Sequence, residues 1–293
     1  SVKTTLAGWK TVNGFGTDDA QAVYFNALDL GFGRQMHMKK TGTNVAYYVT
    51  NFANADEAIL GTLPIATVAM EYSPVGSSSP FTKFYVFDSA GNRITSADLD
   101  GGGQKFIPKL CIVCHGNNSG SVSGSTYSNL GDVDAEFIPF PLDSFTYAHS
   151  LPGSAQEADF KELNRQVLAT SPSTAVSQMV EGWYGGPTLP NSIQNSAFVP
   201  SGWSPNPGLY NSVVKHSCRI CHSTRPYPVD WSAWSDTTNN AFKEKGLITK
   251  IFVTNTKKMP NAKATWQQFH GTGQCDLLRN AGLDNWASNE ACP

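Results

Sequence analysis

The sequence predicts an α+β protein in which a β-rich N-terminal part is followed by two mainly helical, loop-rich modules. Residues 1–105 contain several short segments rich in β-branched and aromatic residues. Two copies of the pattern Cys-x-x-Cys-His follow, at 111–115 and 218–222, and a stretch rich in Gly, Pro, Ser and Asn separates them. The expected divisions are therefore 1–105, 106–205 and 206–293.

Composition narrows the class of protein. The chain has 293 residues, of which 40% are hydrophobic and 15% charged, and this balance is typical of a folded protein. Its formal net charge of −2 lacks the basic excess with which proteins bind nucleic acid, so we expect no nucleic-acid partner. No segment approaches the roughly 20 apolar residues of a membrane helix, so we also expect no membrane span.

The N-terminal part is expected to form an antiparallel sheet. Three segments have strand composition and are bounded by turn-forming residues, namely 45–52 (VAYYVTNF), 65–72 (IATVAMEY) and 81–87 (FTKFYVF). Residues 88–92 (DSAGN) read as a turn, and 98–103 (DLDGGG) as a break before the first motif.

The middle of the chain is expected to be helical around an extended segment. Residues 137–145 (FIPFPLDSF) are apolar and interrupted by proline, so we expect them to line a cofactor edge or the core as extended chain. Ser154 and Glu157 form a capping-box pattern before one helix, and Ser171-Pro172 opens a second. Each helix carries apolar residues at helical spacing: Phe160, Leu163 and Val167 in the first, and Val176, Met179, Val180 and Trp183 in the second. Residues 185–207 read as a linker.

The two Cys-x-x-Cys-His motifs are the strongest functional signal, because this pattern is the attachment signature of c-type haem. Two thiols three residues apart lie on one side of a helical turn, where both can bond to one porphyrin, and the adjacent histidine then binds the iron. We therefore expect two covalently bound haems, with His115 and His222 as the proximal iron ligands. The expected thioether residues are Cys111, Cys114, Cys218 and Cys221. A zinc or dithiol site is the alternative, but neither explains the histidine after each pair.

The other two cysteines, Cys275 and Cys292, suggest a disulfide, although two free thiols remain an alternative. A disulfide fits an oxidising compartment. The chain begins at Ser1 without a basic-then-apolar leader, as expected of an exported protein whose signal peptide has been removed. We expect a periplasmic or extracellular location.

The C-terminal part resembles a class I cytochrome c over roughly residues 205–275. A helical stretch runs into Cys218, a Met-Pro pair follows at 259–260, and Trp266 lies on a last helix. The resemblance implies that His222 and Met259 are the axial ligands of the second haem. The whole chain also looks like exported di-haem c-type cytochromes, through the blocks GFGRQMHM (31–38), VAYYVTNF (45–52), CIVCHG (111–116), FIPFPLDSF (137–145) and CRICH (218–222).

The first haem lacks a following Met-Pro, so its distal ligand must come from elsewhere. We favour His37, because a side chain in a Gly-rich turn before a strand can be aimed at a cofactor. The alternatives are an open iron or one of four other residues, His149, Met36, Met38 and Met70.

These features predict a di-haem cytochrome c that transfers electrons between redox protein partners. The alternative is a peroxidase- or oxidase-type enzyme with one open-site haem, for which Glu71, Glu136 or His149 could act as acid or base. A third hypothesis makes residues 1–105 a separate binding module for a partner or surface.

Overall fold

A six-stranded antiparallel sheet organises the N-terminal half of the molecule. The computed structural model describes residues 3–28, 30–98, 103–116, 122–123, 126–127, 131–219, 223–224, 269, 271 and 273–280. The strands pair in chain order, so the sheet is a meander. They are β1 (Ala20–Asn26), β2 (Phe32–Thr41), β3 (Asn44–Phe52), β4 (Ala66–Ser73), β5 (Phe81–Phe87) and β6 (Arg93–Ile94). The three strands expected at 45–52, 65–72 and 81–87 are confirmed, with shifts of one residue at their ends.

Strand β2 corrects the sequence interpretation of residues 31–38. This block is not a turn before a strand, because β2 runs through it and His37 lies within the strand. Gly33 fits a strand here for a specific reason: a Cβ atom at this position would lie 1.9 Å from the carbonyl oxygen of Asn54. The glycine therefore permits a close backbone approach instead of forming a turn.

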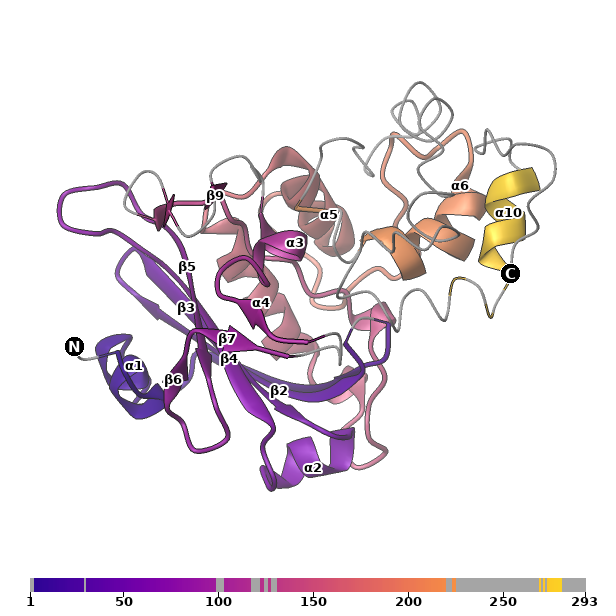
Figure 1. Cartoon of the computed structure of the whole chain (residues 1–293). Helices are drawn as coiled ribbons and strands as arrows, with labels where there is room; N and C mark the ends of the chain where they lie inside the picture. The colour runs from indigo at the N-terminus through magenta and orange to yellow at the C-terminus, as the bar shows by residue number, and fades with distance from the viewer. Residues whose placement is uncertain are drawn as a thin grey trace.

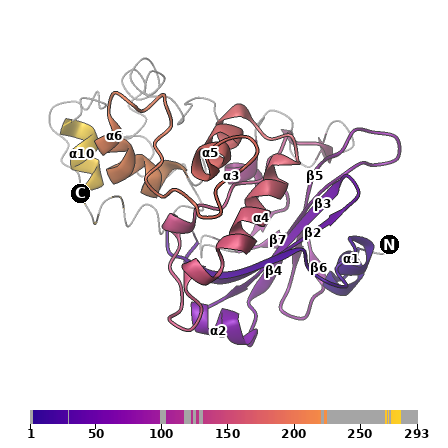
Figure 2. The same ribbon diagram turned by 180° about the vertical axis from the view of Figure 1, so that it is seen from behind.

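Successive side chains of the strands face opposite sides of the sheet. One side, here called the α4 face, carries Met36, Tyr47 and Met70, which share a core cluster with α4 (Glu157–Leu168). The other side, the α1 face, carries Tyr48 and Tyr85, which pack around Trp9 of α1 (Leu6–Val12). Helix α2 (Ala55–Leu60) packs at the end of this second face through Ala58. Figures 1 and 2 show α4 and α5 together on one side of the sheet.

The core crosses the expected boundary at 105/106. Its main cluster joins strand residues such as Met36 and Tyr47 to Phe140 and Phe160, which come from beyond that boundary. Gln156 strengthens the junction, since its side chain accepts a hydrogen bond from the Val23 amide (2.7 Å) and donates one to the Val23 carbonyl (3.0 Å). It thereby pairs with the backbone of the edge strand β1. The sheet and the first motif region thus share one hydrophobic core.

Helices α4 and α5 (Thr174–Tyr184) bury the apolar positions that the sequence predicts. The predicted capping box is wrong, because Ser154 lies in a 3₁₀ turn, η4 (Gly153–Ala155), and Gln156 occupies the N-cap. The carboxylate of Glu157 instead accepts a hydrogen bond from the Gln194 amide at 3.1 Å. Shorter elements complete this region: β7 (Ser96–Ala97), β8 (Lys105–Phe106), α3 (Ile112–His115), β9 (Val122–Ser123), β10 (Thr126–Tyr127) and η3 (Leu142–Ser144).

The stretch expected to be a linker, 185–207, packs against α5. Leu189 and Trp203 are buried, and Phe198 lies so close to Gly182 that a Cβ there would meet its ring at 2.0 Å. The chain continues into α6 (Pro207–Leu209) and a π-helix, η5 (Tyr210–Cys218), which confirms the helical approach to the second motif. Helix α10 (Gln274–Asn280) lies near this segment.

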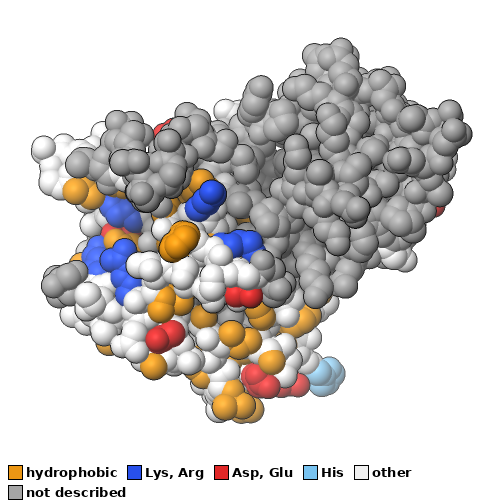
Figure 3. Space-filling view, viewed as in Figure 1, with side chains coloured by type: hydrophobic (Ala, Val, Ile, Leu, Met, Phe, Trp, Pro, Cys, Tyr) orange, Lys and Arg blue, Asp and Glu red, His pale blue; other side chains and the backbone are white. Residues whose placement is uncertain are grey.

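The described surface carries few large exposed apolar side chains. On the face in Figure 3, hydrophobic side chains are scattered, and Lys and Arg gather towards the left. Among the described helices, none is both long and apolar enough to cross a membrane.

Candidate functional site

The first Cys-x-x-Cys-His motif occupies a short helical turn at the edge of the main core. Cys111 precedes α3, and Cys114 and His115 form its last two residues. Both cysteines are partly buried. Cys111 packs against the core cluster of the α4 face, and burial, with a smaller contribution from Cys114, raises the pKa of its thiol to about 12.

His115 is held by both its backbone and its ring. Its Nδ1 lies 2.9 Å from the carbonyl oxygen of Glu136, and the Glu136 amide donates a 2.7 Å hydrogen bond to the His115 carbonyl. Because a carbonyl only accepts, Nδ1 carries the proton and Nε2 keeps its lone pair. Burial lowers the pKa of His115 to about 4, so the ring is neutral at physiological pH. This is the state in which imidazole binds a metal, with the other nitrogen oriented by a backbone carbonyl.

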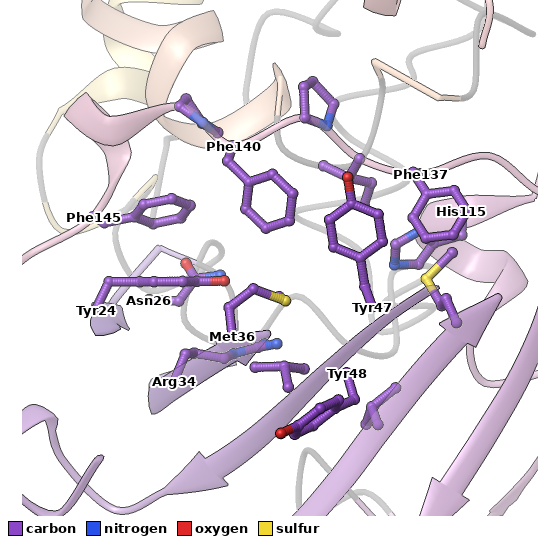
Figure 4. Close-up of a pocket in the computed structure, with 16 residues that line it drawn as sticks. Tyr24, Asn26, Arg34, Met36, Tyr47, Tyr48, His115, Phe137, Phe140 and Phe145 are labelled. Carbon is purple, nitrogen blue, oxygen red and sulfur yellow. The ribbon is translucent and has the colours of Figure 1, made fainter. Parts of the chain in front are cut away.

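A cavity of about 780 Å³, including its open mouth, lies between the α4 face of the sheet and residues 137–141, and His115 lines it (Figure 4). Its walls are mainly aromatic and aliphatic, with Asn26 and Arg34 as the principal polar side chains. Figure 4 shows the rings of Phe140 and Phe145 across from the sheet residues Tyr24 and Met36. The expectation that 137–145 lines the core or a cofactor edge agrees with this position, but the expected extended chain is interrupted by the 3₁₀ helix η3 over Leu142–Ser144.

Two buried amide side chains hold residues 140–142 in place, at the wall of the cavity opposite the sheet, here called the upper wall. Asn164 of α4 accepts a hydrogen bond from the Phe140 amide (2.8 Å) and donates one to the Phe140 carbonyl (2.9 Å). Gln194 accepts from the Leu142 amide (2.8 Å) and also donates to the Phe140 carbonyl (3.1 Å). These contacts satisfy backbone groups that no strand partner reaches. The cavity is therefore built by side chains from elements far apart in the sequence.

The structure does not bring His37 to His115. His37 stacks on Tyr48 on the α1 face at 4.3 Å between ring centroids, and its Nδ1 lies 2.6 Å from Asp18 Oδ2. His115 lines the cavity on the opposite side of the sheet. Successive residues of a strand face opposite sides of the sheet, so His37 faces away from the cavity that its neighbour Met36 lines. This placement does not support the sequence interpretation of His37 as distal ligand.

The other four candidate ligands differ in whether they line the cavity. His149 is exposed. Met38 is fully buried on the α4 face but does not line the cavity. Met36 and Met70 both line it, together with His115. Of the five residues weighed for the distal position, only these two methionines share the cavity with His115.

The second motif begins at the end of η5, where Cys218 is buried and Arg219 is only 3% exposed. Cys221, His222, Met259 and Cys292 lie outside the described residues, as does Trp266. Cys275 belongs to α10, but its side chain is not described. The expected ligands of the second haem and the expected disulfide therefore stay predictions.

Residues that follow the second motif contact the first, although Cys218 follows Cys111 by 107 positions. The hydroxyl of Thr224, two residues beyond the second motif, donates a hydrogen bond to the carbonyl of Cys114. Ser173 links the same regions, because its amide donates to Glu136 Oε2 (2.9 Å) and its hydroxyl donates to the Ser223 carbonyl (3.4 Å). Glu136, which orients His115, is thus tied through Ser173 to the second motif. Sequence reasoning missed this role, because a backbone carbonyl partner leaves no residue-type signal.

Among the described residues, no group of three or more His, Cys, Asp or Glu side chains is arranged to hold a metal ion. A zinc site built from both motifs would include Cys221, which lies outside the described residues. Haem attachment instead directs the thiols to the porphyrin rim and the imidazole to the iron, and an apolar cavity beside the imidazole suits the macrocycle.

No protein-family model, curated protein or solved structure matches this chain. The motifs and the geometry around them are therefore the evidence on function.

Proposed function

We propose that the chain is an exported di-haem c-type cytochrome that transfers electrons between redox protein partners. Cys111, Cys114, Cys218 and Cys221 would hold the haems, and His115 and His222 would be the proximal ligands. When bound, each haem c supplies a one-electron iron couple. The C-terminal module would then use Met259 as its distal ligand, as the class I resemblance implies.

One observation carries the electron-transfer proposal, namely that Thr224 beyond the second motif is bonded to the Cys114 carbonyl in the first. Two attachment motifs in contact through their flanks would hold two prosthetic groups near each other. Ser173 and Glu136 form a second link between the same regions. This arrangement suits a carrier with two communicating centres.

The residues around the first cavity would fix and shield its haem. The Glu136 carbonyl orients His115, burial keeps its ring neutral, and mainly aromatic and aliphatic side chains would surround the macrocycle. Arg34 at the polar part of the lining would complement a haem carboxylate. Met36 or Met70 would complete the coordination of the iron, because thioether sulfur from either side chain shares the cavity with the imidazole.

The cavity favours the carrier over the open-site enzyme. Its described lining includes no carboxylate, and His115 is its only histidine. Glu71 lies on the α1 face in contact with Lys3, Glu136 accepts from the Ser173 amide, and His149 is exposed. None of the three acid–base candidates therefore lines the cavity, where a peroxidase-type reaction needs one.

The test begins with the full chain, produced with export and haem-attachment machinery. Intact mass under denaturing conditions is expected to show two covalent haems. A Cys111→Ser/Cys114→Ser double variant and a Cys218→Ser/Cys221→Ser double variant are each expected to lose one. Stoichiometric high-spin iron in the electron paramagnetic resonance spectrum of the oxidised wild-type protein would favour the open-site enzyme. Wild-type protein carrying no haem, with zinc bound instead, would contradict the proposal.

A further inference from the structure

A buried cluster with excess positive charge lies at the start of the second motif. Arg219 Nη2 donates to Asp143 Oδ1 (2.9 Å) and to Ser144 Oγ (2.8 Å). Lys215 Nζ lies 2.6 Å from the other carboxylate oxygen, Asp143 Oδ2. Burial opposes ionisation of Asp143, but Arg219 and Lys215 hold its pKa below the ordinary value. Two cations therefore share one carboxylate, and the three side chains carry a formal charge of +1.

Several hydrogen-bonding atoms in this cluster have no partner among the described residues. They are Arg219 Nε and Nη1 and the Ser223 hydroxyl. The Tyr210 hydroxyl lies within hydrogen-bonding reach of Arg219. Arg219 also lies over the ring of Trp183, 5.3 Å from its centroid, but this contact leaves the in-plane N–H groups unused. Native proteins rarely leave a buried donor without a partner. The unpartnered donors of Arg219 and Ser223 therefore indicate a place for another polar group.

Tyr210 lies close to Arg219 in this cluster. Tyr210 is 1% exposed, and although burial raises the pKa of its hydroxyl, the nearby Arg219 charge opposes that rise. His216 adds no positive charge to this place at neutral pH, because burial, together with Lys215 and Arg219, lowers its pKa. An unpartnered guanidinium N–H and a phenol hydroxyl can each donate one hydrogen bond to a carboxylate, and the guanidinium charge complements that anion.

Burial identifies the source of that carboxylate. Arg219 and Ser223 are each 3% exposed and Thr224 is fully buried, so an anion cannot diffuse in freely from solution. A group attached to the chain can be enclosed as the chain folds, and each haem brings carboxylates of its own. We propose that Arg219, with Tyr210, binds a propionate of a haem attached to this chain. The inference rests on the proposed function, and either of the two haems can be the source.

The inference is tested on the full-length di-haem protein by resonance Raman spectroscopy and redox titration. Arg219→Gln should move the propionate bending vibration of one haem. It should also lower the midpoint potential of that haem, because an uncovered negative charge favours ferric iron. The expected shift is about tenfold in the oxidised-to-reduced ratio, or about 59 mV for a one-electron couple. The haem that responds identifies which motif supplies the propionate.

Two further variants separate binding from general electrostatics and from misfolding. Lys215→Gln removes a cation of the same cluster and should leave the propionate vibration in place. Tyr210→Phe should shift the same vibration as Arg219→Gln, by less, and decides the matter if Arg219→Gln does not fold. An unchanged vibration in both Arg219→Gln and Tyr210→Phe overturns the inference, as does an equal response to Lys215→Gln. The haem count of the wild-type protein tests the proposed function separately.

Discussion

Thr224 donates its hydroxyl hydrogen bond to the backbone carbonyl of Cys114, so the flank of one Cys-x-x-Cys-His motif rests directly on the other motif. The contact is fully buried on the Thr224 side. It joins two parts of the chain that the sequence separates by more than a hundred residues. The folded core therefore holds the flank of the second motif against the first motif.

Removing this hydroxyl should weaken the junction. Thr224→Val keeps the shape of the side chain but leaves the Cys114 carbonyl without this partner, so the free energy of unfolding should fall by about 1–2 kcal/mol. Thr224→Ser keeps the hydroxyl and should retain most of the hydrogen bond. Urea denaturation of the two variants makes the comparison, and equal stability of Thr224→Val and wild type would show that the contact contributes nothing.

Replacement of the cavity methionines should reveal the distal ligand of the first haem. Met36→Leu and Met70→Leu nearly preserve volume, so packing changes should be small. One variant should lose the methionine–iron charge-transfer absorption of the first haem and gain high-spin signal, while the other should keep the wild-type spectrum. His37→Phe is the matched control on the α1 face and should leave the iron spectra unchanged. If His37→Phe were the only variant to lose the wild-type spectrum, that result would support His37 as the distal ligand.

The upper wall of the cavity should depend on Asn164. Asn164→Leu keeps the size of the side chain but leaves the Phe140 amide unpaired, so we expect a loss of about 2 kcal/mol in unfolding free energy. Gln166→Leu lies on the same helix and removes an amide that bonds only to Glu162, so its effect should stay within about 0.5 kcal/mol. Chemical denaturation measures both, and a similar cost for the two variants would argue against a special role for Asn164.

Acid stability should depend on Glu71. Burial alone would raise the pKa of this carboxyl, but the hydrogen bond and charge of Lys3, together with Asn13 and Lys83, hold it below the ordinary value of 4.5. A lowered folded-state pKa stabilises the protein above pH 4.5, and this stabilisation is lost as pH falls through the folded value. Glu71→Gln should therefore cost about 2 kcal/mol at pH 7 and flatten the decline of stability below pH 5. Denaturation midpoints across that pH range provide the check, and parallel pH profiles would contradict it.

The sequence predicted local structure better than it predicted which segments meet. Strands β3, β4 and β5 follow from their β-branched and aromatic composition between turn-forming residues, and the buried faces of α4 and α5 follow from hydrophobic periodicity. Strand β2 was missed because Gly31 and Gly33 resemble turn signals, whereas Gly33 lies within the strand and accommodates the carbonyl of Asn54. The error over His37 has the same origin, because the face of a strand residue depends on a register that only the pairing of β1, β2 and β3 defines.

The candidate site was predictable only in part. The spacing of Cys111, Cys114 and His115 identifies the first motif in the sequence. No sequence pattern predicts the cavity beside it. It depends on Asn164 and Gln194, whose amide side chains bind the backbone of residues 140 and 142 across long sequence separations. Such contacts leave no periodic pattern. The same holds for Arg219, because its contacts with Asp143 and Ser144 join residues more than 70 positions apart.

The proposal that two covalent haems in one fold act as paired electron carriers can be tested by a spectroscopic redox titration of the full chain, on protein whose mass shows its haem content. We predict two reversible one-electron steps per chain, with low-spin iron in the oxidised state. A single reversible step accounting for one haem per chain would contradict the proposal.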